Sequence, residues 1–305
     1  MRKVLIALAL AVLAGAVGGW VLTEPQSLAA GALGPHTANF DNGRTMFFAG
    51  GCASCHVTPN QDDRSRLGGG LALTSPFGTF HVPNISPHPQ DGIGSWSEAD
   101  FVTAMTKGTS PDGRHYYPAF PYASYQRMRL EDVRDLFAYL KTLPPVAGRP
   151  PDHDLGFPYN LRRAVGLWKW LYLDGKPFAA DPALPADVAR GAYLVEGPGH
   201  CAECHSPRDA LGGIIPAQRF AGGPNPEGKG WVPNITPAGL KDWSADDIAY
   251  LLETGMTPEG DSIGGSMAPV IRNMEQLSPA DRAAIAAYLK ALPPVEGPKR
   301  REAGE

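Results

Sequence analysis

The hydrophobic pattern of the chain begins with one unbroken apolar run. Arg2 and Lys3 precede an uncharged stretch from Val4 to Leu22, which is just long enough to cross the hydrocarbon core of a bilayer as a helix. Residues 1–24 are therefore predicted to form a membrane anchor. A removed signal segment is the alternative, because a cleavage site is available among Ala29, Ala30 and Ala32. In both cases the basic flank stays inside and the remainder is exported.

After this run, apolar residues follow helical spacing in the same order in two halves of the chain. First helices are expected around 43–49 and 189–196. The last helix of the first half carries five apolar residues at helical spacing: Leu130, Val133, Leu136, Phe137 and Leu140. Its counterpart begins at Ser278, a good N-cap, followed by Pro279. Both last helices stop at a Pro-Pro pair, which cannot continue a helix.

Middle helices are predicted from capping boxes, which pair a serine with an aspartate three residues later. The pairs are Ser97 with Asp100 and Ser244 with Asp247. Between the helices lie long loops without strand alternation, and the chain contains 36 Gly and 31 Pro among 305 residues. Loops of this length are unusual in compact domains unless a ligand holds them. The pattern predicts an all-α fold with long Gly/Pro loops.

Three longer stretches repeat between the halves. HVPNIS at 81–86 resembles WVPNIT further on, SWSEADF resembles DWSADDI, and AYLKTLPPV at 138–146 resembles AYLKALPPV. The offset stays close to 149, the separation of Cys52 and Cys201. This regularity indicates a tandem duplication. In chain order, the predicted segments are domain 1, a linker, domain 2 and a charged tail: 38–146, 147–183, 184–297 and 298–305.

The linker contains one further helical pattern. Leu161, Val165, Trp168 and Tyr172 fall on one helical face. The basic residues of the same stretch fall elsewhere: Arg162, Arg163 and Lys169. The pattern predicts a short amphipathic helix that packs its apolar face across both domains.

Charge and cysteine content narrow the possible functions. The formal net charge is −4, and no long run of one sign occurs, so the chain lacks the basic footprint of a nucleic-acid-binding protein. All four cysteines lie in two motifs, CASCH at 52–56 and CAECH at 201–205. None is left for a separate disulfide framework.

Two chemistries fit these motifs poorly. A structural zinc site needs four soft ligands on one ion, whereas motifs at the same place in each repeat predict one site per domain. A thioredoxin-like dithiol expects a βαβ context, which the pattern lacks. Neither chemistry uses His56 or His205, the residues that follow the second cysteine of each motif.

Haem attachment uses every residue of the two motifs. C-x-x-C-H is the attachment signal of c-type haem, in which both thiols form thioethers and the histidine binds the iron. The sequence therefore predicts two covalently bound haem c groups. The predicted attachment residues are Cys52, Cys55, Cys201 and Cys204, and the predicted axial iron ligands are His56 and His205.

These motifs, together with VPNIS and VPNIT, GRHYYPAFPY, GGSMAPVIRN and the AYLK-LPPV helix ends, resemble one family. It comprises the dihaem and multihaem c-type cytochromes that serve membrane-bound dehydrogenases of bacteria, such as alcohol and gluconate dehydrogenases. The resemblance runs from about residue 40 to 296. Dehydrogenase subunits of this family usually carry three C-x-x-C-H motifs, whereas this chain has two. The resemblance implies two cytochrome c domains in tandem.

The resemblance also implies a methionine as the second axial ligand of each iron. In the second domain this is Met267, whose glycine-rich flanks allow close approach to a haem, with Met274 as the rival. In the first domain, Phe120 stands where many relatives have methionine, and Met128 is the expected substitute. His115 and an open iron position are the alternatives there. Core packing is the other explanation for each methionine.

The expected function is one-electron transfer on the periplasmic side of the bacterial inner membrane. The donor would be a dehydrogenase, and the acceptor a cytochrome or an oxidase. No catalytic residue is assigned. The alternative is a dihaem enzyme of the peroxidase type, which requires an open iron position at the first haem.

Overall fold

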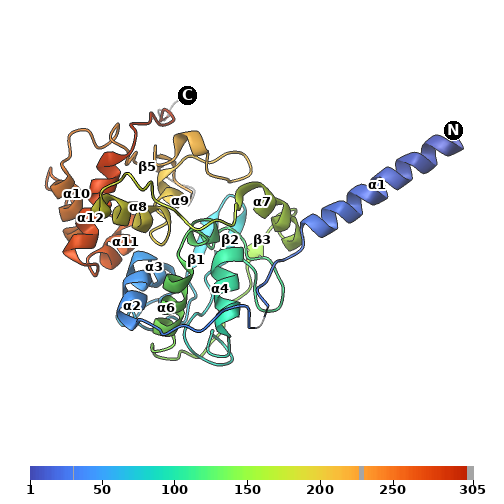
Figure 1. Cartoon of the computed structure of the whole chain (residues 1–305), viewed down its shortest axis with the longest axis horizontal. Coiled ribbons are helices and arrows are strands. Elements are labelled where there is room, and N and C mark those ends of the chain that lie inside the picture. The colour runs from blue at the N-terminus through green and yellow to red at the C-terminus, as the bar shows by residue number, and fades with distance from the viewer. Residues whose placement is uncertain (30, 227–229, 301–305) are drawn as a thin grey trace.

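The computed structural model describes residues 1–29, 31–226 and 230–300. Helix α1 (Arg2–Leu22) extends away from the body of the protein (Figure 1). Among the described residues, it is the one helix that is both long enough and apolar enough to cross a membrane. Ala30 and the last part of the predicted tail, 301–305, lie outside the described residues.

The first half of the body contains short helices and one hairpin. Its elements are α2 (Phe40–Ala49), α3 (Cys52–His56), β1 (Ala72–Ser75), β2 (Gly78–His81), α4 (Glu98–Lys107), α5 (Tyr122–Tyr125) and α6 (Leu130–Leu140). The predicted linker contributes β3 (Asp154–Leu155), the 3-10 helix η1 (Arg162–Ala164) and α7 (Val165–Tyr172).

The second half repeats the helical order of the first. Its elements are α8 (Ala186–Glu196), α9 (Ala202–His205), η2 (Pro216–Gln218), β4 (Gly223–Pro224), β5 (Trp231–Val232), α10 (Ala245–Thr254), α11 (Met267–Met274) and α12 (Pro279–Ala291). The two halves form adjacent bodies in Figure 1, with α8 to α12 in one and α2 to α6 in the other.

The three helix starts predicted from capping serines are confirmed, whereas the first helices begin three residues earlier than predicted, at Phe40 and Ala186. Both Ser97 and Ser244 make complete capping boxes, each with the aspartate three residues on. Ser278 accepts a hydrogen bond from the backbone N–H of Asp281, and Pro279 occupies the first turn of α12. These local hydrogen bonds satisfy backbone donors that a helix start leaves unpaired, which explains why sequence identified them.

The prediction of an all-α fold is wrong in one respect. The protein is mostly helical, but β1 pairs antiparallel with β2, and β2 pairs antiparallel with β3 from the linker. A second, two-stranded pair joins β4 and β5. Strands of two to four residues are too short for alternation to show in sequence, which is why they were not predicted.

The first and last helices of each half cross at a glycine. A Cβ at Gly43 would lie 2.2 Å from the carbonyl oxygen of Asp135, on α6. A Cβ at Gly191 would lie 1.8 Å from the carbonyl oxygen of Ala284, on α12. Any larger residue would force these helices apart. The same close crossing therefore organises both halves.

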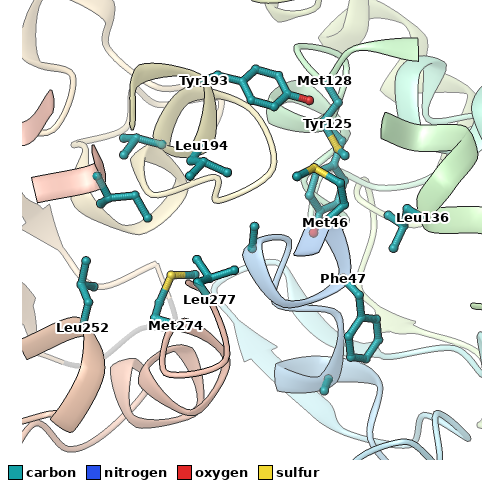
Figure 2. Packing of buried hydrophobic residues seen from close by; sticks show 14 of the residues in the cluster. Met46, Phe47, Tyr125, Met128, Leu136, Tyr193, Leu194, Leu252, Met274 and Leu277 are labelled. Carbon is teal, nitrogen blue, oxygen red and sulfur yellow. The ribbon is translucent and has the colours of Figure 1, made fainter. Parts of the chain in front are cut away.

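One hydrophobic core runs across the two halves. Figure 2 shows its central part, where Met46, Tyr125 and Met128 of the first half lie in the same cluster as Tyr193 and Leu277 of the second. Helix α11 contacts both α2 and α3. The halves are thus packed together rather than tethered by the linker alone.

Candidate haem sites

Each cysteine motif forms a short helix that follows a left-handed turn. Gly51, with φ of 60°, precedes α3, and His200, with φ of 39°, precedes the motif of the second half. One helical turn separates the two cysteines of each motif, so both face the same side. The chain thus presents two thiols and a following imidazole from one compact turn in each half.

The two motif histidines share one orientation. Nδ1 of His56 lies 2.8 Å from the carbonyl oxygen of Pro83, and Nδ1 of His205 lies 2.8 Å from that of Pro233. A carbonyl only accepts, so Nδ1 carries the proton, and the lone pair of Nε2 remains available as a ligand. This is the tautomer that an axial haem histidine requires. Desolvation lowers the pKa of His56 to about 4, which keeps its imidazole neutral.

The prolines belong to the repeated VPN segments, and the next residue anchors each segment. The side-chain N–H of Asn84 donates to the carbonyl of Val146 over 2.7 Å, and Asn234 donates to Val295 over the same distance. The accepting valines directly follow the Pro-Pro pairs that lie shortly after the last helices. Sequence reasoning identified these repeats but missed their role, which is to hold the chain that orients the histidine.

The competing chemistries for the motifs are not supported. Among the described residues, no group of three or more His, Cys, Asp or Glu side chains converges as a metal site would. Desolvation raises the pKa of Cys52 and of Cys201 to about 12. A redox-active dithiol needs the opposite shift, because the thiolate is the nucleophile. Neither the zinc nor the dithiol interpretation finds support in the geometry of the described residues.

The candidate methionines occupy different environments. Met267 is half-buried and begins α11, whereas Met274 ends that helix and is buried. Met128 is only 2 % exposed and follows α5 within the shared core (Figure 2). Its counterpart Leu277 is equally buried, at 4 % exposed. Burial alone therefore does not separate ligation from packing at Met128.

His115, the alternative ligand, is already engaged. Its side chain is buried, and Nε2 donates to the carbonyl oxygen of Thr23 over 2.8 Å. The backbone carbonyl of His115 accepts a hydrogen bond from Arg162. These contacts tie His115 to the end of α1 and to the linker, which disfavours it as an iron ligand.

The side chain of the third residue of each motif forms a hydrogen bond with the other half of the protein. Asn273 donates to the hydroxyl of Ser54 over 2.6 Å, and Ser124 donates to the carboxylate of Glu203 over 2.7 Å. Ser54 and Glu203 occupy equivalent positions, and so do Ser124 and Asn273, at the same offset in sequence. Contacts that repeat in this reciprocal way define a pseudo-two-fold interface. Sequence offered no signal for it.

The fold and the paired motifs together define a protein with two c-type haem sites. The family model of cytochrome c matches residues 40–144 and again 188–293. The chain belongs to the cytochrome c family. Two such domains support two covalently bound haem c groups, as the sequence predicts.

Individual relatives agree with this classification. A dihaem cytochrome c-type protein of Cereibacter sphaeroides is 51% identical over 97% of this chain and 100% of its own length. The fructose dehydrogenase cytochrome subunit of Gluconobacter japonicus is 36% identical over 89% of this chain. The cytochrome c subunit of the quinone alcohol dehydrogenase of Gluconacetobacter polyoxogenes is 36% identical over 81%. The chain spans 55% and 54% of the last two subunits.

Proposed function

We propose that this cytochrome carries single electrons from a membrane-bound dehydrogenase to a respiratory acceptor. One observation carries the proposal: His56 and His205 are held in the same orientation by equivalent proline carbonyls, each with Nε2 available. Two identical binding arrangements suit two redox centres of one kind. A peroxidase, in contrast, needs two centres with different iron coordination.

Specific residues would hold each cofactor. Cys52, Cys55, Cys201 and Cys204 would form the thioether bonds, and His56 and His205 would bind the irons. Met267 would complete the second site and Met128 the first. When bound, haem c supplies a reversible one-electron couple whose potential depends on axial ligands and burial. The protein sets both through these side chains and its core.

The pseudo-two-fold interface supports communication between the sites. Ser54 and Glu203 lie within the two cysteine motifs, and each contacts the opposite half directly. The ring of Tyr125 lies 5.5 Å from that of His200, next to the second motif. Motifs that meet across one packed interface favour electron exchange within the chain.

The dehydrogenase partner rests on the named relatives, which are cytochrome subunits of fructose and alcohol dehydrogenases. The membrane location rests on α1 and on Arg2 and Lys3, which would remain on the inner side. The haem domains would then lie on the periplasmic side. The acceptor would be a further cytochrome or an oxidase.

Contacts at the end of α1 favour a retained anchor over a removed signal segment. Thr23 is buried, and its carbonyl accepts from His115. Arg163 donates to the Thr23 hydroxyl over 3.1 Å and to the carbonyl of Trp20 over 2.5 Å. Cleavage near Ala29 would remove these partners. A buried donor left unpaired costs about 1–3 kcal/mol.

Substrate-driven reduction in native membranes tests the proposal. Membranes with and without this protein are given dehydrogenase substrates, while haem reduction and oxygen uptake are recorded. We expect a substrate that reduces the protein, and slower oxygen uptake on that substrate when the protein is missing. Sustained turnover of hydrogen peroxide by the purified protein would contradict the proposal and favour the peroxidase alternative.

A further inference from the structure

Helix α7 carries apolar residues on its outward side as well as on its inward side. Its outward residues are apolar: Leu167, Leu171 and Trp170, the last 64 % exposed. Its inward face includes Lys169, which is only 9 % exposed. Of the predicted apolar face, Val165 is buried and Trp168 and Tyr172 are half-buried, whereas Leu161 lies before α7 and is exposed. Lys169, predicted to fall elsewhere, lies inside.

The buried lysine fixes this orientation. Its Nζ donates to the carbonyl of Gly108 over 2.5 Å and lies 5.2 Å from the ring centroid of Tyr122. Desolvation lowers the pKa of Lys169 to about 7. These contacts give the cation partners inside the protein, so α7 is held with Leu167, Trp170 and Leu171 outward.

The exposed side of α7 continues into the preceding loop. We call the whole surface the apolar face, and it consists of Phe157, Tyr159, Leu161, Leu167, Trp170 and Leu171, all exposed. Single exposed apolar residues are normal, whereas a run of six within 15 positions marks an interaction surface.

The apolar face begins where α1 ends. Helix α7 contacts α1, and a Cβ at Gly166 would lie 2.6 Å from the Cβ of Thr23. The guanidinium of Arg163 lies 4.3 Å above the ring of Trp20. Figure 1 shows α7 at the base of the projecting α1. Every residue of α1 is itself exposed or half-exposed, so two helices in contact, α1 and α7, both expose apolar side chains.

The composition of this surface matches the boundary of a bilayer. Tryptophan and tyrosine are enriched at the headgroup level of membranes, and apolar helix faces lie in the same layer. Trp20, Tyr159 and Trp170 provide such aromatic residues near the exported end of α1. The contacts of α11 with α2 and α3 join the two cytochrome domains without using the apolar face.

We propose that the apolar face lies in the outer headgroup layer of the same bilayer that α1 spans. This inference rests on the proposed retention of α1 as an anchor. It goes further, because it fixes how the haem domains stand over the membrane. Lys169 ties α7 to the first domain, and Trp168 and Tyr172 bond to Leu211 and Asp209 of the second.

Photo-crosslinking of the full-length protein tests the inference. The purified protein, with both haems, is reconstituted into vesicles of phosphatidylcholine and phosphatidylglycerol. A benzophenone amino acid replaces one exposed residue at a time: Leu10 in α1, Trp170 in the apolar face, and Tyr250 in α10. Tyr250 is a matched control, because it is an exposed aromatic on a helix of the second domain. Lipid adducts are counted by mass spectrometry.

We expect lipid adducts at Leu10 and Trp170, with a yield at Trp170 several-fold above that at Tyr250. Adducts at Leu10 without adducts at Trp170 would overturn the inference and leave the anchor intact. Crosslinks from Trp170 to a second copy of the chain, or equal lipid yields at Trp170 and Tyr250, would also overturn it. No lipid adduct at Leu10 would refute the anchor itself, and the inference with it.

Discussion

The two cytochrome domains differ on one side of their haem sites and agree on the other. Both hold the motif histidine through a proline carbonyl, and both anchor that segment through an asparagine. On the opposite side, three matched positions hold different residues in the first and second domain: Phe120 and Met267, Tyr125 and Met274, Met128 and Leu277.

This difference shows which part of the site the fold constrains. The histidine side depends on backbone carbonyls and helix crossings, which leave little freedom. The proposed methionine ligand depends on one flexible side chain in an apolar surrounding, so another position could supply its sulfur. In the first domain, Tyr125 instead donates to the carbonyl of Gly50 over 2.8 Å, beside the first motif.

Removal of the attachment cysteines of one motif should make the two domains differ most, because one domain then lacks a covalent haem. Cys52→Ala combined with Cys55→Ala should leave one covalent haem, because only the second motif can then form thioethers. Cys201→Ala combined with Cys204→Ala is the matched variant. Haem staining and the mass of the intact chain measure the result. Two covalent haems remaining in either variant would contradict the assignment.

Replacement of each candidate methionine by leucine should distinguish iron ligation from core packing. Met128→Leu keeps most of the apolar volume, so a packing role alone would cost less than about 1.5 kcal/mol of stability. If Met128 is the ligand, its replacement by leucine should leave the first haem high-spin and able to bind carbon monoxide. Met267→Leu should do the same at the second haem. An unchanged spectrum in Met128→Leu, with a changed one in His115→Ala, would assign His115 instead.

Substitution at the helix crossings should affect both domains alike. Gly43→Ala and Gly191→Ala each introduce a methyl group against a backbone carbonyl that cannot rotate away. Overpacking of this kind typically costs about 1–3 kcal/mol. Chemical denaturation of both variants, monitored by far-ultraviolet circular dichroism, measures the loss. A neutral effect in one domain alone would show that its crossing is looser than described.

Acid should lower the stability of the first domain through the carboxylate of Asp135, which the second domain lacks. Desolvation acts to raise the pKa of Asp135, but hydrogen bonds from Asn39, Asn42 and His36 outweigh it and lower the pKa below its ordinary value. Because the folded pKa is lowered, this stabilisation is present at neutral pH. It is lost as the pH falls below about 4.

Asp135→Asn should therefore lower stability at neutral pH by about 1 kcal/mol and flatten its decline in acid. The second domain has Ala284 at the matched position. Denaturation curves from pH 3 to 7, roughly the range in which such a carboxylate titrates, provide the measurement. The same acid dependence in the variant and the parent would show that Asp135 does not contribute it.

Sequence predicted the features that depend on local chemistry. The caps at Ser97, Ser244 and Ser278 are signals of a few neighbouring residues, and the repeat revealed two copies of one unit. The role of Pro83 and Pro233 was not predictable in this way, because a backbone carbonyl has no side-chain signature. The pairing of Ser54 with Asn273 depends on how two domains meet, which no local pattern records.

The linker helix shows a further limit. Periodicity identified the face of Val165, Trp168 and Tyr172, which is buried or half-buried, but it did not reveal the buried Lys169 or the apolar residues on the outward side. The usual rule places apolar residues inside because water surrounds the protein. At Trp170 and Leu171 the rule fails, and the proposed contact of these residues with lipid would account for the failure.

The near-infrared magnetic circular dichroism spectrum of the oxidised, full-length protein tests the central claim most directly. The claim is that both domains hold low-spin haem with one histidine and one methionine ligand, despite their different sequences. The account predicts methionine–iron charge-transfer intensity from two haems per chain, and loss of half of it in Met128→Leu. A high-spin signal from one haem of the unaltered protein, or a bis-histidine signal in place of one methionine band, would contradict it.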